Sequence, residues 1–343
     1  MQKRIFLWMA FMMLFIGSAS AARFWIADFE IAANETKTIS INLDNTEDIY
    51  GYVLWLKLPE GVTIASDEYG YIVNPTSRFN NTPLVYFADG YYKITAATGG
   101  RPVSGTEGAL LTFDVTASHL ISTGTQAFGI EHQQITVNDA DGAAKTVDQE
   151  SSSYDCTTKV NVKTAASGFG TFSWPRSLDF TESGLEAYVG TEVKEGKLAL
   201  QQITKVPAGT GIVVYGTPST TFNPSVIEDG QAETSFVNVL LPTHEAPLAV
   251  TNGGYYALAT KDSNGTAFYE VTPGVTIPQY EAYLYGASTG GSDAVTFDVT
   301  PSGIQEIAGE DAQGACYNLQ GVRVTKMSKG GIYILNGKKI VVK

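Results

Sequence analysis

The stretch Thr36–Leu58, TKTISINLDNTEDIYGYVLWLKL, contains two segments in which apolar and polar residues alternate. They are Thr36–Leu43 and Tyr50–Leu58, and the second ends at the turn residues Pro59-Glu60-Gly61. Successive side chains of a strand point to opposite faces, so a period of two predicts strands with one buried face. In the second segment the even-numbered residues form the apolar face, and Trp55 belongs to the other face.

The same pattern continues as far as residue 137, with Gly, Pro or Asn-Asp turns at intervals of roughly 8–12 residues. Helix signals are nearly absent. The further strands that we expect are Leu84–Phe87, Tyr91–Ala96, Ala109–Val115, Ala127–His132 and Gln134–Val137. We therefore predict an all-β protein whose first domain, residues 22–155, is an immunoglobulin-like β-sandwich.

One motif in the first domain resembles a protein family. A strand followed by Leu43-Asp44-Asn45, then a long apolar strand that ends Leu58-Pro59-Glu60-Gly61-Val62, is similar to cohesin domains. The resemblance covers about 130 residues. It implies a module that binds dockerins or that serves as an immunoglobulin-like spacer on a surface protein. No dockerin is recognised in the chain itself.

Length and charge narrow the class of protein. A chain of 343 residues suits two or three domains. The net charge is -13, and charged residues make up 17% of the chain. An acidic protein lacks the positive charge that neutralises phosphates, so we expect no nucleic acid as a partner.

Residues 1–21 have the three parts of a secretory signal peptide. Lys3-Arg4 is basic, Ile5–Ile16 is apolar, and Ala19-Ser20-Ala21 matches a cleavage site. No cysteine follows the cleavage site, so a lipid anchor is not expected. We predict that the protein is secreted or attached to the outer-membrane surface.

Residues 156–300 are predicted to form a second β domain. The segment Gly168–Pro175, then Leu178–Phe180, resembles a β-rich module of surface proteins from the Bacteroidota. Tyr283 and Tyr285 alternate with Leu284, and core packing is the interpretation that we favour for them. The strands expected here are Thr158–Lys163, Ile212–Tyr215, Tyr255–Ala259, Ala267–Val271 and Ala282–Tyr285.

A polar linker, residues 301–316, leads to the basic tail 317–343, YNLQGVRVTKMSKGGIYILNGKKIVVK. Asn336-Gly337 lies between the strands Ile332–Leu335 and Lys338–Val342 and predicts a tight hairpin. Strands are also expected at Tyr317–Leu319 and Val322–Val324.

The tail resembles the C-terminal module of secreted and surface proteins of the Bacteroidota, including the type A sorting domain of type IX secretion. The resemblance implies recognition by export or anchoring machinery. The alternative is a strand pair that completes the preceding domain, with lysines that protect its edge. The residues implied in sorting are Gly331, Tyr333, Gly337, Lys338, Lys339 and Lys343.

Signatures of catalysis and of cofactor sites are missing. His119, His132 and His244 share no metal-ligand spacing, and no nucleophile elbow or P-loop is present. A glycan-active enzyme would need two facing carboxylates, and no motif selects such a pair. Asp139-Ala140-Asp141-Gly142 is similar to part of a calcium loop, but Val137 stands where an oxygen ligand is required. We predict a hairpin turn there, no cofactor, and a protein that is not an enzyme.

Cys156 and Cys316 are the only cysteines. They could form a disulfide in an oxidising compartment. We favour the interpretation that both are small buried hydrophobic residues.

Aromatic residues supply the best argument for binding. If the even face of Tyr50–Leu58 is core, Trp55 faces solvent or a neighbouring strand. Aromatic rings combine apolar area with a polar group, which suits sugars and protein partners. The alternative places Trp55 in the core. The candidate contact residues are Trp55, Tyr69, Tyr71, Tyr86 and Tyr91.

These observations favour a non-catalytic binding protein that adheres to a glycan or to a surface protein. One alternative is a scaffold that captures dockerin-bearing, glycan-degrading enzymes. Another is a structural spacer, which would carry no aromatic contact face.

Overall fold

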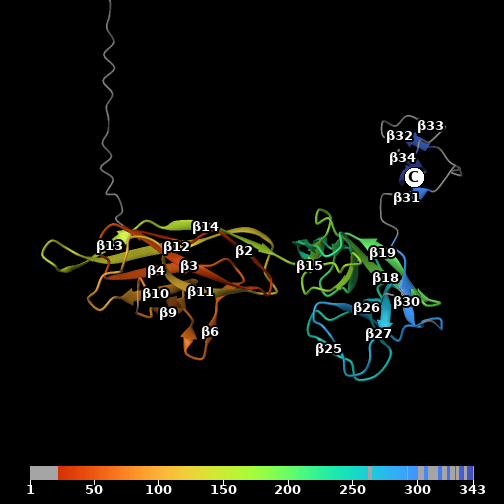
Figure 1. Cartoon of the computed structure of the whole chain (residues 1–343), viewed down its shortest axis with the longest axis horizontal. Coiled ribbons are helices and arrows are strands. Elements are labelled where there is room, and N and C mark those ends of the chain that lie inside the picture. The colour runs from red at the N-terminus through yellow and green to blue at the C-terminus, as the bar shows by residue number, and fades with distance from the viewer. Residues whose placement is uncertain are drawn as a thin grey trace, which may run out of the picture. The chain divides into compact units, whose positions relative to one another are not determined.

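The structure is a computed structural model of the chain. It describes residues 22–79, 81–261, 265–291, 293–299, 305–307, 316–318, 323–324, 329, 332–335 and 338–342. Apart from one 3-10 turn, Asp229–Gln231, the regular elements of these residues are strands, which confirms the predicted all-β class (Figure 1). No helix among them is long and apolar enough to cross a membrane. The predicted signal peptide lies outside the described residues.

The chain divides into two compact units. The first consists of the described parts of Met1–Lys163 with Pro175–Ser183 and Thr221–Ala232, and the second contains the remainder. Strand β14, Ser152–Lys159, runs through the predicted domain boundary at residue 155. The predicted strand Thr158–Lys163 is wrong in its extent, because β14 ends at Lys159 and a separate strand, β15 (Val162–Lys163), pairs with β22 (Thr221–Phe222).

Two sheets form the sandwich of the first unit. The β3 sheet has the order β1 (Ala22–Trp25), β3 (Thr36–Asn45), β11 (Ala109–Ala117), β5 (Val62–Ile64), with β8 (Asn74–Pro75) also on β11. The β4 sheet has the order β2 (Phe29–Ala32), β14, β12 (Gly124–Asn138), β4 (Gly51–Lys57), β10 (Tyr91–Ala97), β9 (Leu84–Ala88), with β13 (Ala144–Gln149) also on β12.

The apolar faces of these two sheets share one core. Ile41 and Leu43 of β3 are fully buried in the same cluster as Leu54 and Leu56 of β4. Each such side chain contributes about 1.5–3 kcal/mol by leaving water. The predicted β-sandwich is therefore confirmed, with the even face of β4 inward and Trp55 on the outer face.

One expected pair of strands is a single strand. Ala127–His132 and Gln134–Val137 both belong to β12, and its register against β4 shifts between Ile130 and His132. Such a β-bulge adds a residue on one strand and changes which side chains share a face.

Arg78 holds a loop to the end of β3. Its guanidinium donates to the carbonyl oxygens of Leu43 (2.7 Å), Gly108 (2.6 Å) and Ser104 (2.8 Å) and to Oδ1 of Asn45 (2.7 Å). Partial burial lowers the pKa of the Arg78 guanidinium. A planar group with five donors can satisfy this many acceptors at once, whereas an ammonium cannot.

The second unit is built on a nine-stranded sheet. Its order is β16 (Phe169–Phe172), β21 (Ile212–Tyr215), β18 (Glu186–Lys194), β19 (Lys197–Ile203), β30 (Ala294–Phe297), β27 (Gly265–Glu270), β26 (Tyr255–Lys261), β29 (Ala282–Tyr285), β24 (Leu241–Pro242). Val213, Phe268 and Val295 are fully buried in its core. The expected strands Ile212–Tyr215 and Ala282–Tyr285 have the predicted bounds.

Strands of the tail also form a sheet. The order is β31 (Gln305–Ile307), β35 (Lys338–Val342), β34 (Ile332–Leu335), β32 (Cys316–Asn318), β33 (Arg323–Val324). The predicted hairpin is confirmed, since β34 and β35 pair with Leu335 opposite Lys338. Strand β31 comes from the segment predicted as a linker. Tyr333 is buried. Gly331, Gly337, Lys343 and the side chains of Lys338 and Lys339 lie outside the described residues.

Cys156 is buried and its thiol is free, and burial raises its pKa to about 11. The side chain of Cys316 lies outside the described residues.

In the second unit the carboxylate of Glu281 is largely buried. It accepts a hydrogen bond from Oγ1 of Thr171. Loss of solvation raises the pKa of Glu281, and the bond from Thr171 offsets part of this effect.

Replacing Arg78 by Lys should lower the free energy of unfolding by about 2–4 kcal/mol, because several partly buried carbonyl oxygens lose a charged donor. Urea unfolding of both proteins measures the difference. Arg23→Ala, at an exposed position on β1, is the control and should have a much smaller effect. Equal stabilities of wild type and Arg78→Lys would show that the loop does not depend on this side chain.

Glu281→Gln should make the second unit more stable at neutral pH. The folded state holds the Glu281 proton more tightly than the unfolded chain, so wild-type stability falls as the pH rises above the ordinary carboxyl range through the raised pKa. The amide keeps an acceptor for Thr171 and does not titrate. The free energies of unfolding of both proteins are measured from pH 4 to pH 8. The variant should become increasingly more stable than wild type as the pH rises. Glu245→Gln, at an exposed carboxylate, should leave the wild-type slope unchanged.

Candidate binding face around Trp55

A row of side chains crosses four strands on the outer face of the β4 sheet. Tyr86 of β9 is opposite Lys93 of β10, Lys93 is opposite Trp55 of β4, and Trp55 is opposite His132 of β12. Directly opposed residues on one face are close enough to contact each other. We call the outer face built on this row and on the adjacent Tyr91 the Trp55 face.

Trp55 is half-buried and its ring is surrounded. Its centroid lies 4.8 Å from the His132 ring and 5.8 Å from the Tyr91 ring, both tilted to it. Nζ of Lys93 lies 4.3 Å from the Trp55 centroid, a cation–π contact that covers one side of the indole. Lys93 also donates to Oδ2 of Asp89 at 2.7 Å. The tryptophan is thus held in place by its neighbours and remains partly exposed.

A second set of contacts lies beside this row. The hydroxyl of Tyr91 donates to Oε2 of Glu131 at 2.6 Å, and this bond raises the pKa of Tyr91. Nζ of Lys57 lies 3.8 Å from Oε1 of Glu131 and 5.8 Å from the centroid of the Tyr91 ring. The Trp55 face therefore combines aromatic rings with paired charges. Exposed pairs of this kind contribute little to stability.

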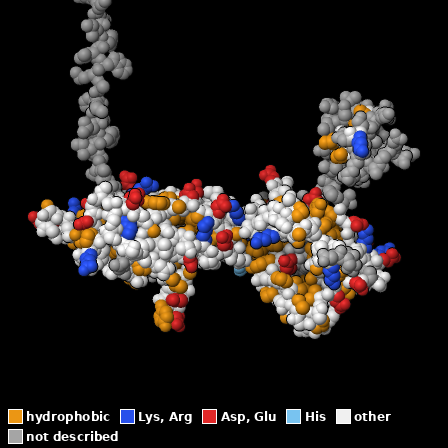
Figure 2. Space-filling view, in the orientation of Figure 1, with side chains coloured by type: hydrophobic (Ala, Val, Ile, Leu, Met, Phe, Trp, Pro, Cys, Tyr) orange, Lys and Arg blue, Asp and Glu red, His pale blue; other side chains and the backbone are white. Residues whose placement is uncertain are grey.

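The structure brings three of the five predicted contact residues together: Trp55, Tyr86 and Tyr91. Tyr71 instead packs edge-on against Tyr92, with centroids 5.0 Å apart. Tyr69 is 88% exposed in the turn between β6 (Ser66–Asp67) and β7 (Gly70–Tyr71). That hairpin projects from the first unit, and its tip shows hydrophobic and acidic side chains (Figures 1 and 2).

Lys93 and His132 were not among the predicted residues. Lys93 lies opposite Trp55 only through the β4–β10 pairing, and His132 does so only because of the bulge in β12. Neither pairing can be deduced from alternation within a single strand, so the sequence carries no direct signal for them.

The segment Asp139-Ala140-Asp141-Gly142 closes the β12–β13 hairpin, as predicted. Oδ1 of Asp139 accepts from the backbone N–H of Asp141 (3.0 Å) and of Ala143 (2.8 Å). Over the part of the chain that the structure describes, no group of three or more His, Cys, Asp or Glu side chains could hold a metal ion.

Comparisons with known proteins concern part of the chain. No protein-family model matches it, and a search of curated proteins finds no similar sequence. Among solved structures it is similar to a non-cellulosomal cohesin of Archaeoglobus fulgidus (14% identity, 40% of this chain and 92% of that one, TM-score 0.31). It is also similar to a cohesin module from a Clostridium perfringens family 33 glycoside hydrolase (16% identity, 40% and 94%, TM-score 0.30). A third is the Coh-OlpA–Doc918 cohesin–dockerin complex of Clostridium thermocellum (9% identity, 40% and 99%, TM-score 0.32).

Proposed function

We propose that the chain is a non-catalytic binding protein and that the Trp55 face binds a protein partner. The observation that carries the proposal is the row Tyr86, Lys93, Trp55 and His132 across an open sheet face. Protein interfaces typically have aromatic residues at the centre and charged residues around them. Here Lys57, Glu131 and Asp89 supply the surrounding charges.

The contacts of Trp55 favour a protein over a glycan. Sugar rings bind to flat aromatic surfaces whose apolar face is free. The ammonium of Lys93 occupies one side of the indole, 4.3 Å from its centroid, and Lys57 and Glu131 add charges beside it. Such a surface is uneven and charged, and it suits the mixed side chains of a protein.

The resemblance to cohesins suggests what kind of protein the partner is. A dockerin module carried by a secreted, glycan-degrading enzyme is one candidate, and another protein of the cell surface is the second. A structural spacer would not use this face at all. The binding experiment below separates these alternatives.

Trp55→Ala should weaken binding of the partner by at least about thirtyfold, the effect of a hot-spot residue worth about 2 kcal/mol. The assay titrates the mature chain, 22–343, with a panel of purified dockerin modules and with glycans, using calorimetry. Tyr285→Ala, in the second unit, is the control and should bind any dockerin like wild type. Because Trp55 is half-buried, Trp55→Ala should lower the free energy of unfolding by less than the roughly 3–5 kcal/mol lost when a fully buried aromatic is removed.

Saturable dockerin binding that Trp55→Ala retains would place the contact elsewhere. If wild type binds a glycan and Trp55→Ala does not, the ligand of the Trp55 face is a sugar and not a protein. If no dockerin binds, cross-linking from a photoreactive residue at position 86 on cells identifies a surface protein, and the absence of any specific adduct supports the spacer.

We propose further that the protein acts outside the cell and that its tail is read by an export or anchoring machine. Supporting this are the signal-peptide pattern of residues 1–21 and the β34–β35 hairpin with its lysines. Lysines on a short hairpin could contact an acidic receptor.

Replacing Lys338 and Lys339 together by Ala should reduce the surface-exposed fraction severalfold, with the protein retained behind the outer membrane. Protease accessibility on intact cells, followed by fractionation, measures this. Lys326→Ala with Lys329→Ala, elsewhere in the tail, provides a charge-matched control. Normal surface levels in the first variant would favour the alternative in which the hairpin only completes the structure.

A further inference from the structure

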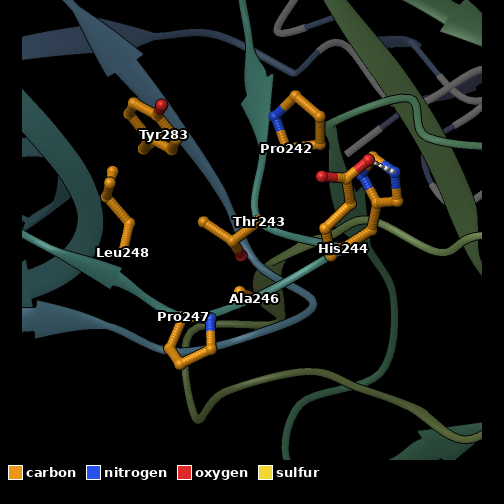
Figure 3. A pocket seen from close by; sticks show the side chains of 8 residues that line it. Pro242, Thr243, His244, Ala246, Pro247, Leu248 and Tyr283 are labelled. Atoms are coloured by element: carbon orange, nitrogen blue, oxygen red, sulfur yellow. Dashed lines mark ion pairs between the residues drawn. The ribbon is translucent and has the colours of Figure 1, made fainter.

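A pocket in the second unit lies between the segment Pro242–Leu248 and the side chain of Tyr283 (Figure 3). Its volume is about 420 Å³. Small-molecule sites typically have volumes of about 300–1,000 Å³, with mostly apolar walls and a few polar groups. The pocket therefore has the size of a ligand site.

Hydrogen bonds to backbone carbonyl oxygens fix the wall of this pocket. Thr243 donates from its backbone N to the carbonyl of Glu281 (2.9 Å) and from Oγ1 to that of Pro278 (2.7 Å). Nε2 of Gln279 donates to the carbonyl oxygens of His244 (3.1 Å) and Glu245 (3.0 Å). A wall held at three successive residues in this way is fixed before a ligand binds, which lowers the entropic cost of binding.

The side chains around the pocket are of two kinds. The Tyr283 ring and Leu248 lie on one side, and His244 lies on the other (Figure 3). Glu245 also lines the pocket. Nε2 of His244 lies 3.9 Å from Oε1 of Glu245, whose side chain is 88% exposed. The His244 ring packs over Gly209, where a Cβ would lie 3.1 Å from its Cε1. The imidazole is therefore held with its Nε2 edge towards the Glu245 carboxylate.

Tyr283 belongs to a strip of three tyrosines, Tyr255, Tyr283 and Tyr285, on the outer face of β26 and β29. We call these residues the tyrosine strip. The Tyr255 centroid lies 5.8 Å from that of Tyr283 and 4.7 Å from that of Tyr285. The predicted core packing of Tyr283 and Tyr285 is wrong, because Leu284 alone of the three is buried and Tyr285 is 54% exposed. The sheet is covered on its other face, so the alternation places these rings outward. Hydrophobic side chains also reach the surface where β25 (Leu248–Ala249) lies (Figures 1 and 2).

We propose that this pocket and the adjoining tyrosine strip bind a neutral saccharide. A sugar ring offers an apolar face to stack on Tyr283 and hydroxyl groups that donate to the Glu245 carboxylate. Tyr255 and Tyr285 would then contact further sugar units outside the pocket. This site is separate from the Trp55 face and does not depend on its partner.

Other ligand classes fit this chemistry less well. The residues that line the pocket include one carboxylate and no lysine or arginine, so a phosphate or carboxylate ligand would be repelled. A proline-rich peptide would stack on tyrosine as well. Its prolines carry no N–H, however, and offer the Glu245 carboxylate no donor in exchange for water.

The test uses the mature chain, 22–343, in affinity electrophoresis through gels that contain soluble arabinoxylan, mannan, mixed-linkage β-glucan or starch, all of which are neutral polysaccharides. Calorimetry with oligosaccharides of the retained polysaccharide follows. We expect retardation in at least one gel and a loss of about tenfold or more in affinity for Tyr283→Ala. Tyr283→Phe keeps the aromatic ring, so its affinity for the oligosaccharide should fall only a few-fold. Glu245→Gln should weaken binding, and Tyr285→Ala should weaken only the longer oligosaccharides.

Trp55→Ala is the matched control and should bind saccharide like wild type, whatever its effect on a protein partner. Thermal unfolding of Tyr283→Phe and Glu245→Gln shows that the second unit remains folded. Binding to no polysaccharide would overturn the proposal. So would equal binding by wild type and by both Tyr283 variants, or displacement of the sugar by a proline-rich peptide with higher affinity.

Discussion

The pairing register of β4 with its two neighbours is the constraint on which the first unit depends. Leu54 and Leu56 enter the core only while Ile94 and Ile130 stand opposite them or beside them on β10 and β12. A slip of one residue would exchange the two faces of β4, and Trp55 would enter the core in place of a leucine. The same register aligns Trp55 with Lys93 and His132. Core and binding face are therefore set by one choice of pairing.

The two units expose aromatic residues in different ways. Trp55 is enclosed by a cation and two tilted rings, so its surroundings define a small and specific contact. The tyrosines on β26 and β29 are arranged along a strip beside a pocket and carry no cation on their faces among the contacts described. The first arrangement favours recognition of one protein surface, and the second favours a repetitive polymer.

Local patterns in the sequence predicted local structure well. Alternation identified β4 and the strands at Ile212–Tyr215 and Ala282–Tyr285, and Asn336-Gly337 identified the final hairpin. What alternation could not supply is which face of β29 is covered, because that depends on strands far away in the sequence. For the same reason Tyr285 was expected in the core. The row through Trp55 needs the bulge of β12, and the pocket needs bonds from Gln279 to a segment more than thirty residues before it.

The hydrogen bonds by which Arg78 holds its loop to the end of β3 affect the pH and salt concentrations that the first unit tolerates. Its described partners are backbone carbonyl oxygens and an asparagine side chain, and none of these acceptors changes its charge with pH. A guanidinium stays protonated over the whole range in which proteins fold. Contacts between a charge and a dipole at hydrogen-bond distance are also screened less by salt than exposed ion pairs are. The loop should therefore stay anchored in acidic or saline surroundings, where a clamp made of carboxylates and lysines would loosen.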